Sequence, residues 1–242
     1  MFRTRRTAMA VAATLISVAL LTLGACAGDE TTATTGAKME VETKAAPAAP
    51  ATEETAVTAT LTYFDGGKAV SATPSTKEVP YLSAGRKLAT METTKGTVVM
   101  ELWEDKAPNT VVNFVYLANS GKYDGVEFHR VIDGFMAQTG DVEHKGGYGG
   151  PGYSIPGEFD ESLSHTEGVL SMARSADRDS GGSQFFIMLA TAPHLDGDYA
   201  AFGKVVSGMD VIHSLQKGDS ARNGTVEDPD RIVTLRVETV EE

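Results

Sequence analysis

The stretch FHRVIDGFMAQTGD, residues 128–141, places an arginine among large apolar side chains. Alternate residues of a β-strand share a face, so the pattern predicts that Phe128, Arg130 and Ile132 point the same way. A guanidinium between two apolar neighbours has two explanations. Either this strand face is open to water, or the charge is held there for a function. The rest of the chain has to distinguish them.

From residue 88 onward the composition is globular, and most of the expected elements are strands. Residues 88–103 read as two alternating strands joined at Thr94-Lys95-Gly96. Further strands are predicted over 162–173, 182–190, 202–206 and 231–240. This many strands without a repeated β-α rhythm predict a mostly antiparallel barrel or sandwich.

Two helices and one irregular segment complete this region. A helix is predicted from Pro108 to Gly121, because apolar residues recur there at helical spacing, and a shorter one over 208–218. The glycine-rich residues 140–159 are too irregular for a helix or a strand.

The first residues, MFRTRRTAMAVAATLISVALLTLGAC, have the layout of a secretory signal. A basic start is followed by an apolar run too short for a typical membrane span. An uncleaved amphiphilic anchor is the weaker alternative. Cys26, the only cysteine, follows Leu23-Gly24-Ala25, which resembles a bacterial lipobox. The sequence therefore predicts a signal peptide over 1–25 and a lipidated Cys26 that anchors an exported protein to the extracytoplasmic side of a membrane.

Residues 26–87 are expected to form a tether. Residues 27–60 consist largely of Ala, Thr, Glu and Pro, and such a segment buries too little apolar surface to offset its ordering entropy. Residues 61–86 are richer in apolar side chains and either pack on the domain or extend the tether; the sequence leaves both open. The globular domain is placed at 88–242.

Charge and motif content exclude several functions. The formal net charge is −12, and a surface this acidic repels phosphate backbones, so no nucleic-acid partner is expected. The chain has no HExxH motif, no second cysteine and no glycine-lysine phosphate loop. Its histidines lack short metal-ligand spacings: His129, His144, His165, His194 and His213. Neither a metal nor a cofactor is predicted.

Apolar and amide side chains remain around the arginine, and with the glycine-rich loop they could line a groove for an extended peptide. Three segments then resemble the signature segments of the cyclophilins, the cyclosporin-binding peptidyl-prolyl isomerases: FHRVIDGFMAQTGD, GVLSMARSADRDSGGSQFFIMLATAPHLDG and AFGKVVSGMDVI. Residues 95–132 agree with the family as well. The resemblance implies a mostly β fold, an eight-stranded antiparallel barrel capped by two α-helices.

By motif, Arg130 matches the catalytic arginine of that family and Gln138 the amide beside it. The wall of the proline pocket is matched by Phe135, Met136, Phe186 and Leu195. The segment that holds the peptide backbone and the residue before proline is matched by Ala173, Arg174, Ser175 and Gln184.

Two further pocket positions depart from many eukaryotic members. His194 stands in place of a tryptophan and Tyr199 in place of a histidine, as in the bacterial branch. The loop from Ser175 to Gly182 is slightly longer as well. We therefore expect isomerase activity but only weak binding of cyclosporin.

The chemistry that the resemblance implies needs no nucleophile, metal or proton-transfer group. Rotation about an X-Pro bond breaks amide resonance, and a guanidinium aimed at the proline nitrogen or the displaced carbonyl favours the twisted state. The sequence thus predicts a monomeric, cofactor-free isomerase acting on X-Pro bonds of exported proteins. The alternative is a peptide-binding chaperone or scaffold on the same fold, in which turnover is incidental.

Overall fold

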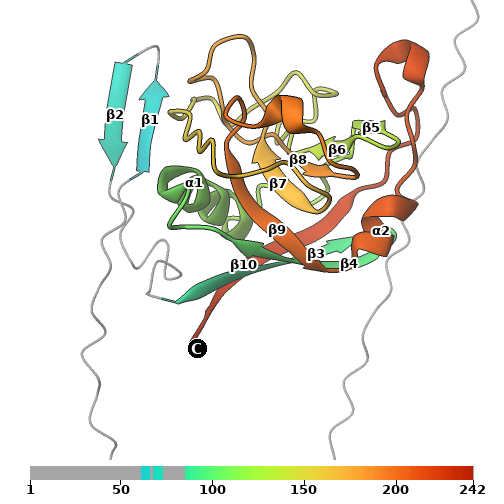
Figure 1. Cartoon of the computed structure of the whole chain (residues 1–242), viewed down its shortest axis with the longest axis horizontal. Coiled ribbons are helices and arrows are strands. Elements are labelled where there is room, and N and C mark those ends of the chain that lie inside the picture. Colours follow the sequence, from blue (N-terminus) through green and yellow to red (C-terminus); the bar gives the residue numbers. More distant parts are fainter. Residues whose placement is uncertain (1–60, 66–67, 73–84, 242) are drawn as a thin grey trace, which may run out of the picture. The chain divides into compact units, whose positions relative to one another are not determined.

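The computed structural model describes residues 61–65, 68–72 and 85–241 (Figure 1). The predicted signal peptide, Cys26 and residues 27–60 of the predicted tether lie outside this range. Among the helices that the structure describes, none combines the length and the apolar composition needed to cross a membrane.

The larger sheet contains eight antiparallel strands in the order β10-β3-β4-β9-β7-β8-β6-β5. Their bounds are β3 Arg86–Thr93, β4 Gly96–Leu102, β5 Arg130–Ile132, β6 Met136–Thr139, β7 Val169–Met172, β8 Phe185–Met188, β9 Ala201–Ser207 and β10 Ile232–Val240. An isolated antiparallel bridge joins Glu127 to Arg231, which links the chain before β5 to the chain before β10. The sheet therefore curls towards closure, and the predicted mostly β architecture is confirmed.

Two α-helices accompany the sheet, α1 Pro108–Asn119 and α2 Met209–Ser214, with 3-10 turns η1 Pro193–Leu195 and η2 Ser220–Arg222. Helix α1 begins with proline, whose missing N–H is no loss at that position. Glu158 caps the helix from a distant loop, because its carboxylate accepts from the backbone N–H groups of Asn109 (3.0 Å) and Thr110 (2.7 Å). The predicted helix is confirmed.

The main core lies between the curled sheet and α1. Phe114 of the helix lies 5.2 Å, between ring centroids, from both Phe185 and Phe202. Phe185 and its neighbour Phe186 point to opposite faces of β8, as successive strand residues must. Phe186 therefore belongs to a second, smaller apolar cluster on the outer face, together with Met136 and Leu195.

The prediction that Phe128, Arg130 and Ile132 share one strand face is wrong for Phe128. Strand β5 begins only at Arg130, after the isolated bridge at Glu127. Phe128 and Val131 are both buried in the main core, which a regular strand cannot achieve with residues three apart. The irregular chain before β5 turns Phe128 inward, while Ile132 packs on the second cluster.

The strand predicted over 162–173 is also shorter than expected, since only Val169–Met172 pair as β7. Gly168 has a positive φ of 83° immediately before it. Turn hydrogen bonds from Leu163 N–H to the Asp160 carbonyl and from Thr166 N–H to the Ser164 carbonyl occupy the preceding residues. These turns keep the residues before Gly168 out of an extended conformation, so the strand begins only at Val169.

A separate hairpin precedes the curled sheet, formed by β1 Leu61–Asp65 and β2 Lys68–Ala72. Leu61 is buried in the main core. The Asn109 side chain accepts from the Thr62 N–H (2.6 Å) and donates to the Thr62 carbonyl (2.9 Å), as a neighbouring strand would. Strand β1 therefore packs against the start of α1.

Candidate functional site

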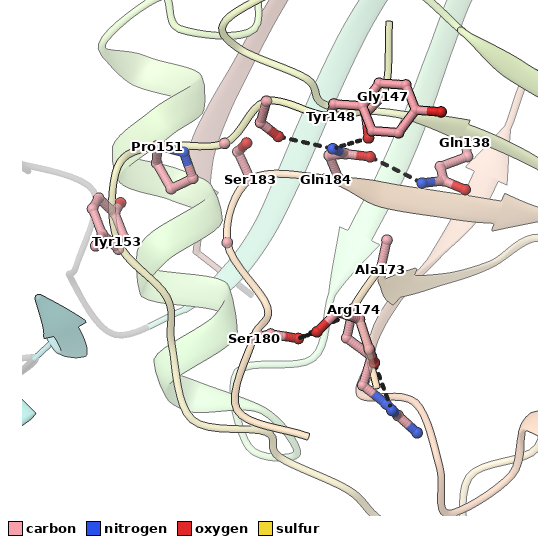
Figure 2. A pocket seen from close by; sticks show the side chains of 14 residues that line it. Gln138, Gly147, Tyr148, Pro151, Tyr153, Ala173, Arg174, Ser180, Ser183 and Gln184 are labelled. Atoms are coloured by element: carbon pink, nitrogen blue, oxygen red, sulfur yellow. Dashed lines mark hydrogen bonds between the residues drawn. The ribbon is translucent and has the colours of Figure 1, made fainter. Parts of the chain in front are cut away.

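Two adjoining hollows, of about 490 and 390 Å³, open beside β6 and share Gln138, Ala173 and Arg174. The first hollow is lined by Arg130, Phe135, Met136, Gln138, Ala173, Arg174, Phe186, His194, Leu195, Asp198 and Tyr199. The second is lined by the glycine-rich loop, by Tyr153 and by the segment from Ser175 to Gln184 (Figure 2). Because they share these three lining residues, the two hollows form one continuous groove.

The first hollow has an apolar floor and aromatic walls. Met136, Phe186 and Leu195 are buried in its floor. The Tyr199 ring meets Phe186 edge to face at 5.6 Å, and the His194 ring stacks on Phe135 at 5.8 Å. Such a surface suits a small apolar ring that has no hydrogen-bond donor.

Arg130, on β5, is held at the edge of this floor by three hydrogen bonds to oxygen atoms. Its Nε and Nη2 donate to the backbone carbonyl and the side-chain Oδ1 of Asn223, and its Nη1 donates to Gln138 Oε1 at 3.2 Å. Burial lowers the pKa of the guanidinium, which nevertheless stays charged. Nη1 also donates weakly to Met136 Sδ at 3.8 Å, so the second N–H of Nη2 is left without a partner among the described residues and is open to a bound ligand.

A chain of amide hydrogen bonds extends from Arg130 to the glycine-rich loop. Gln138 Nε2 donates to Gln184 Oε1 at 2.9 Å. Gln184 Nε2 in turn donates to the carbonyls of Gly147 (2.9 Å) and Gly149 (2.8 Å), as the dashed lines in Figure 2 show. The two hollows are therefore joined by one polar network that crosses β6.

Asp141 organises the glycine-rich loop. Burial by itself would raise the pKa of this carboxyl, but hydrogen bonds from backbone N–H groups outweigh that effect and lower it. The donors include the N–H groups of Lys145 (2.9 Å) and Gly147 (2.7 Å). A Cβ at Gly149 would collide with the Asp141 carboxylate, and one at Gly147 would collide with the His129 ring, so both positions require glycine.

His129 lies directly behind this loop and beside Arg130 in the sequence. Both of its ring nitrogens are buried without a hydrogen-bond partner among the described residues. Burial disfavours the charged imidazolium and lowers the pKa of His129. The ring therefore packs on Gly147 in its neutral form.

Tyr153 forms the side of the second hollow away from Gln138 (Figure 2). Its hydroxyl donates to Asn113 Oδ1 at 2.6 Å, and Asn113 Nδ2 donates to the Gly182 carbonyl at 2.7 Å. Burial raises the pKa of Tyr153, so the hydroxyl stays protonated and can keep donating.

A serine, a histidine and an aspartate also come together, but not as a catalytic site. His165 contacts Asp196 Oδ1 through Nδ1 at 2.8 Å and Ser171 Oγ through Nε2 at 3.0 Å. His165 and Ser171 are completely buried, so no substrate can reach the hydroxyl. The network instead braces η1 and β7 behind Phe186, on which the His165 ring stacks.

Every predicted site residue of the domain lines one of the two hollows. The sequence reading missed Asp198 and Tyr153 as lining residues and Asn223 as the partner of Arg130. Asn223 has a positive φ of 55°, a turn conformation that asparagine tolerates well. Among the described residues, no cluster of three or more His, Cys, Asp or Glu side chains could hold a metal ion.

Comparison with known proteins agrees with this geometry. Residues 88–237 match the family model described as cyclophilin type peptidyl-prolyl cis-trans isomerase/CLD. A peptidyl-prolyl cis-trans isomerase of Synechococcus elongatus is 50% identical over 133 residues, which cover 54% of this chain and 90% of the relative. A probable peptidyl-prolyl cis-trans isomerase of Brucella suis is 46% identical over 154 residues, covering 59% of this chain and 78% of the relative.

Solved structures show the same likeness. A cyclophilin type peptidyl-prolyl cis-trans isomerase of Cryptosporidium parvum, crystallised in the presence of the dipeptide Ala-Pro, superposes with a TM-score of 0.58 at 29% identity. The match covers 63% of this chain and 99% of that one. A cyclophilin from Hirschia baltica gives a TM-score of 0.54 at 30% identity, covering 62% of this chain and 76% of that one.

Proposed function

The chain belongs to the cyclophilin-type peptidyl-prolyl cis-trans isomerases, and we propose that it isomerises X-Pro bonds of exported proteins while anchored to a membrane through Cys26. The anchoring rests on the basic start, the apolar run and the small residues before the only cysteine. Exported polypeptides follow as substrates because an enzyme tethered there meets chains that have just crossed the membrane.

The observation that carries the catalytic proposal is the position of Arg130 at the edge of an apolar floor. In the twisted amide the carbon–nitrogen bond is nearly single and the proline nitrogen gains a localised lone pair. We place the proline ring on Met136, Phe186 and Leu195, and the rest of the peptide along the second hollow. The remaining N–H of Arg130 then favours the twisted state over either planar one.

No covalent step is required in this mechanism, since the bond order changes and no bond is broken. The protein holds the ring while the residue before proline swings, and its guanidinium is oriented before the substrate arrives. Preorganised donors of this kind need little reorganisation at the moment of reaction.

A protease-coupled assay on a proline tetrapeptide tests the catalytic proposal. The isomerase should remove the slow phase that the cis substrate shows without enzyme. A chaperone or scaffold that only binds the peptide would leave the slow phase unchanged, and that result would contradict the proposal.

Membrane fractionation of a Cys26→Ser variant tests the anchoring proposal. The thiol is the proposed attachment point of the lipid, so the variant should leave the membrane fraction or be mislocalised. Identical membrane fractionation of variant and parent would show that Cys26 does not tether the protein.

A further inference from the structure

The β1–β2 hairpin lies outside residues 88–237, which match the family, but β1 contacts the matched domain. Leu61 is buried in the main core, and Thr62 is bound on both sides of its backbone by the Asn109 side chain. These contacts fix the position of the next residue, Tyr63.

Tyr63 packs on Tyr153, with ring centroids 5.1 Å apart and an angle of 54° between the rings. Tyr153 is part of the wall of the second hollow, whereas Tyr63 does not line it. The Tyr63 ring therefore supports the Tyr153 ring from outside the hollow.

The contact reaches further into the site through hydrogen bonds. Tyr153 donates to Asn113, which is completely buried and donates to the carbonyl of Gly182. Gly182 also lines the second hollow, two residues before Gln184. A shift of the Tyr153 ring would thus move one wall of the second hollow directly. It would also weaken the hydrogen bond through which Asn113 holds Gly182 in another wall.

We infer that Tyr63 is a positioning residue. Through Tyr63 the β1–β2 hairpin sets the width of the second hollow, and this width sets the affinity for the part of a peptide that lies beyond the proline pocket. The inference rests on the proposed placement of the peptide along both hollows. Tyr63 lies outside the first hollow, so its effect should fall on peptide affinity and not on the isomerisation step.

Two ligands separate these effects in the full-length protein. An Ala-Pro dipeptide fills only the proline pocket, whereas a six-residue peptide with a central Ala-Pro extends into the second hollow. Dissociation constants for both ligands are measured by calorimetry, and kcat and KM for the longer peptide by the protease-coupled assay. The variants are Tyr63→Ala, Tyr63→Phe, which keeps the ring, and Val233→Ala, a truncation of an exposed side chain of β10 that lines neither hollow.

Tyr63→Ala should weaken binding of the longer peptide about two- to tenfold, the range expected for loss of one aromatic pair, and raise its KM equally. Its kcat and its affinity for Ala-Pro should stay at the parental values. Tyr63→Phe and Val233→Ala should match the parent throughout.

Equal affinity of Tyr63→Ala and parent for the longer peptide would overturn the inference. So would equal weakening of both ligands, which would indicate a general loss of structure. If the parent binds both ligands without turnover, the catalytic proposal fails, while the comparison of dissociation constants still decides the role of Tyr63.

Discussion

Asn223 binds one whole edge of the Arg130 guanidinium: Nε donates to its backbone carbonyl at 2.9 Å and Nη2 to its side-chain Oδ1 at 3.0 Å. Both acceptors belong to a single residue in the turn after η2, far from Arg130 in the sequence. The planar guanidinium is therefore fixed in orientation as well as in position. This orientation does not depend on a bound substrate.

Arg130→Ala should remove most isomerase activity and leave the fold intact. Preorganised donors contribute roughly 10²–10³ in rate, and this side chain lies at the edge of the groove and not in the main core. Arg130→Lys should recover only part of the loss, because an ammonium cannot reproduce the planar contacts to Asn223. Turnover of a proline peptide and thermal unfolding are measured on both variants. A folded Arg130→Ala protein with parental turnover would show that the arginine is merely solvated.

Asn223→Gly should lower kcat/KM about two- to tenfold, since it removes one hydrogen bond to the guanidinium while the backbone carbonyl remains. Glycine adopts the positive φ of 55° at this position freely. Asn223→Ala should lose similar activity and in addition about 1–2 kcal/mol of stability, because a Cβ disfavours this conformation. Chemical denaturation and steady-state kinetics separate the two effects. Parental activity in both variants would show that Asn223 does not orient Arg130.

His129 should make the protein less stable as the pH falls below about 6.5, the usual pKa of histidine in an unfolded chain. Burial lowers its pKa in the folded state, so below that pH the unfolded chain binds more protons than the folded one. Above it both states are neutral, and His129 adds no pH dependence. His129→Phe removes the titration, and its melting temperature should fall less steeply between pH 7 and pH 5 than that of the parent. Identical slopes would contradict a neutral, buried His129.

His194→Trp should increase inhibition by cyclosporin by about one to two decades in affinity. The family resemblance implies that an indole at this position contacts the drug, and an indole buries more apolar area and donates one hydrogen bond. His194 is exposed and stacks on Phe135, so the larger ring has room at the rim of the first hollow. The measurement is the inhibition constant of cyclosporin for the parent and for the variant. Unchanged inhibition would refute the assignment of this position.

The predicted site residues meet at the two hollows because they lie in two continuous segments, 130–138 and 173–199, whose internal spacing is set by the chain itself. Arg130 and Gln138 face each other across the β5–β6 pairing, which follows directly from their separation along one hairpin. Asn223 could not be found in this way, since its contact with Arg130 depends on how a distant turn closes over β5. Phe128 was misplaced because a short irregular segment reverses side-chain direction without any glycine or proline to mark it.

The chain of amides between the glycine-rich loop and Arg130 has a direction. Gln184 must turn its nitrogen towards the carbonyls of Gly147 and Gly149, so only its oxygen is left for Gln138. Gln138 must then turn its own oxygen towards the guanidinium. The carbonyls of Gly147 and Gly149 thus determine, through two glutamine side chains, that the guanidinium faces an oxygen acceptor. Neither amide can flip alone, because a flip would place two oxygens or two N–H groups against each other.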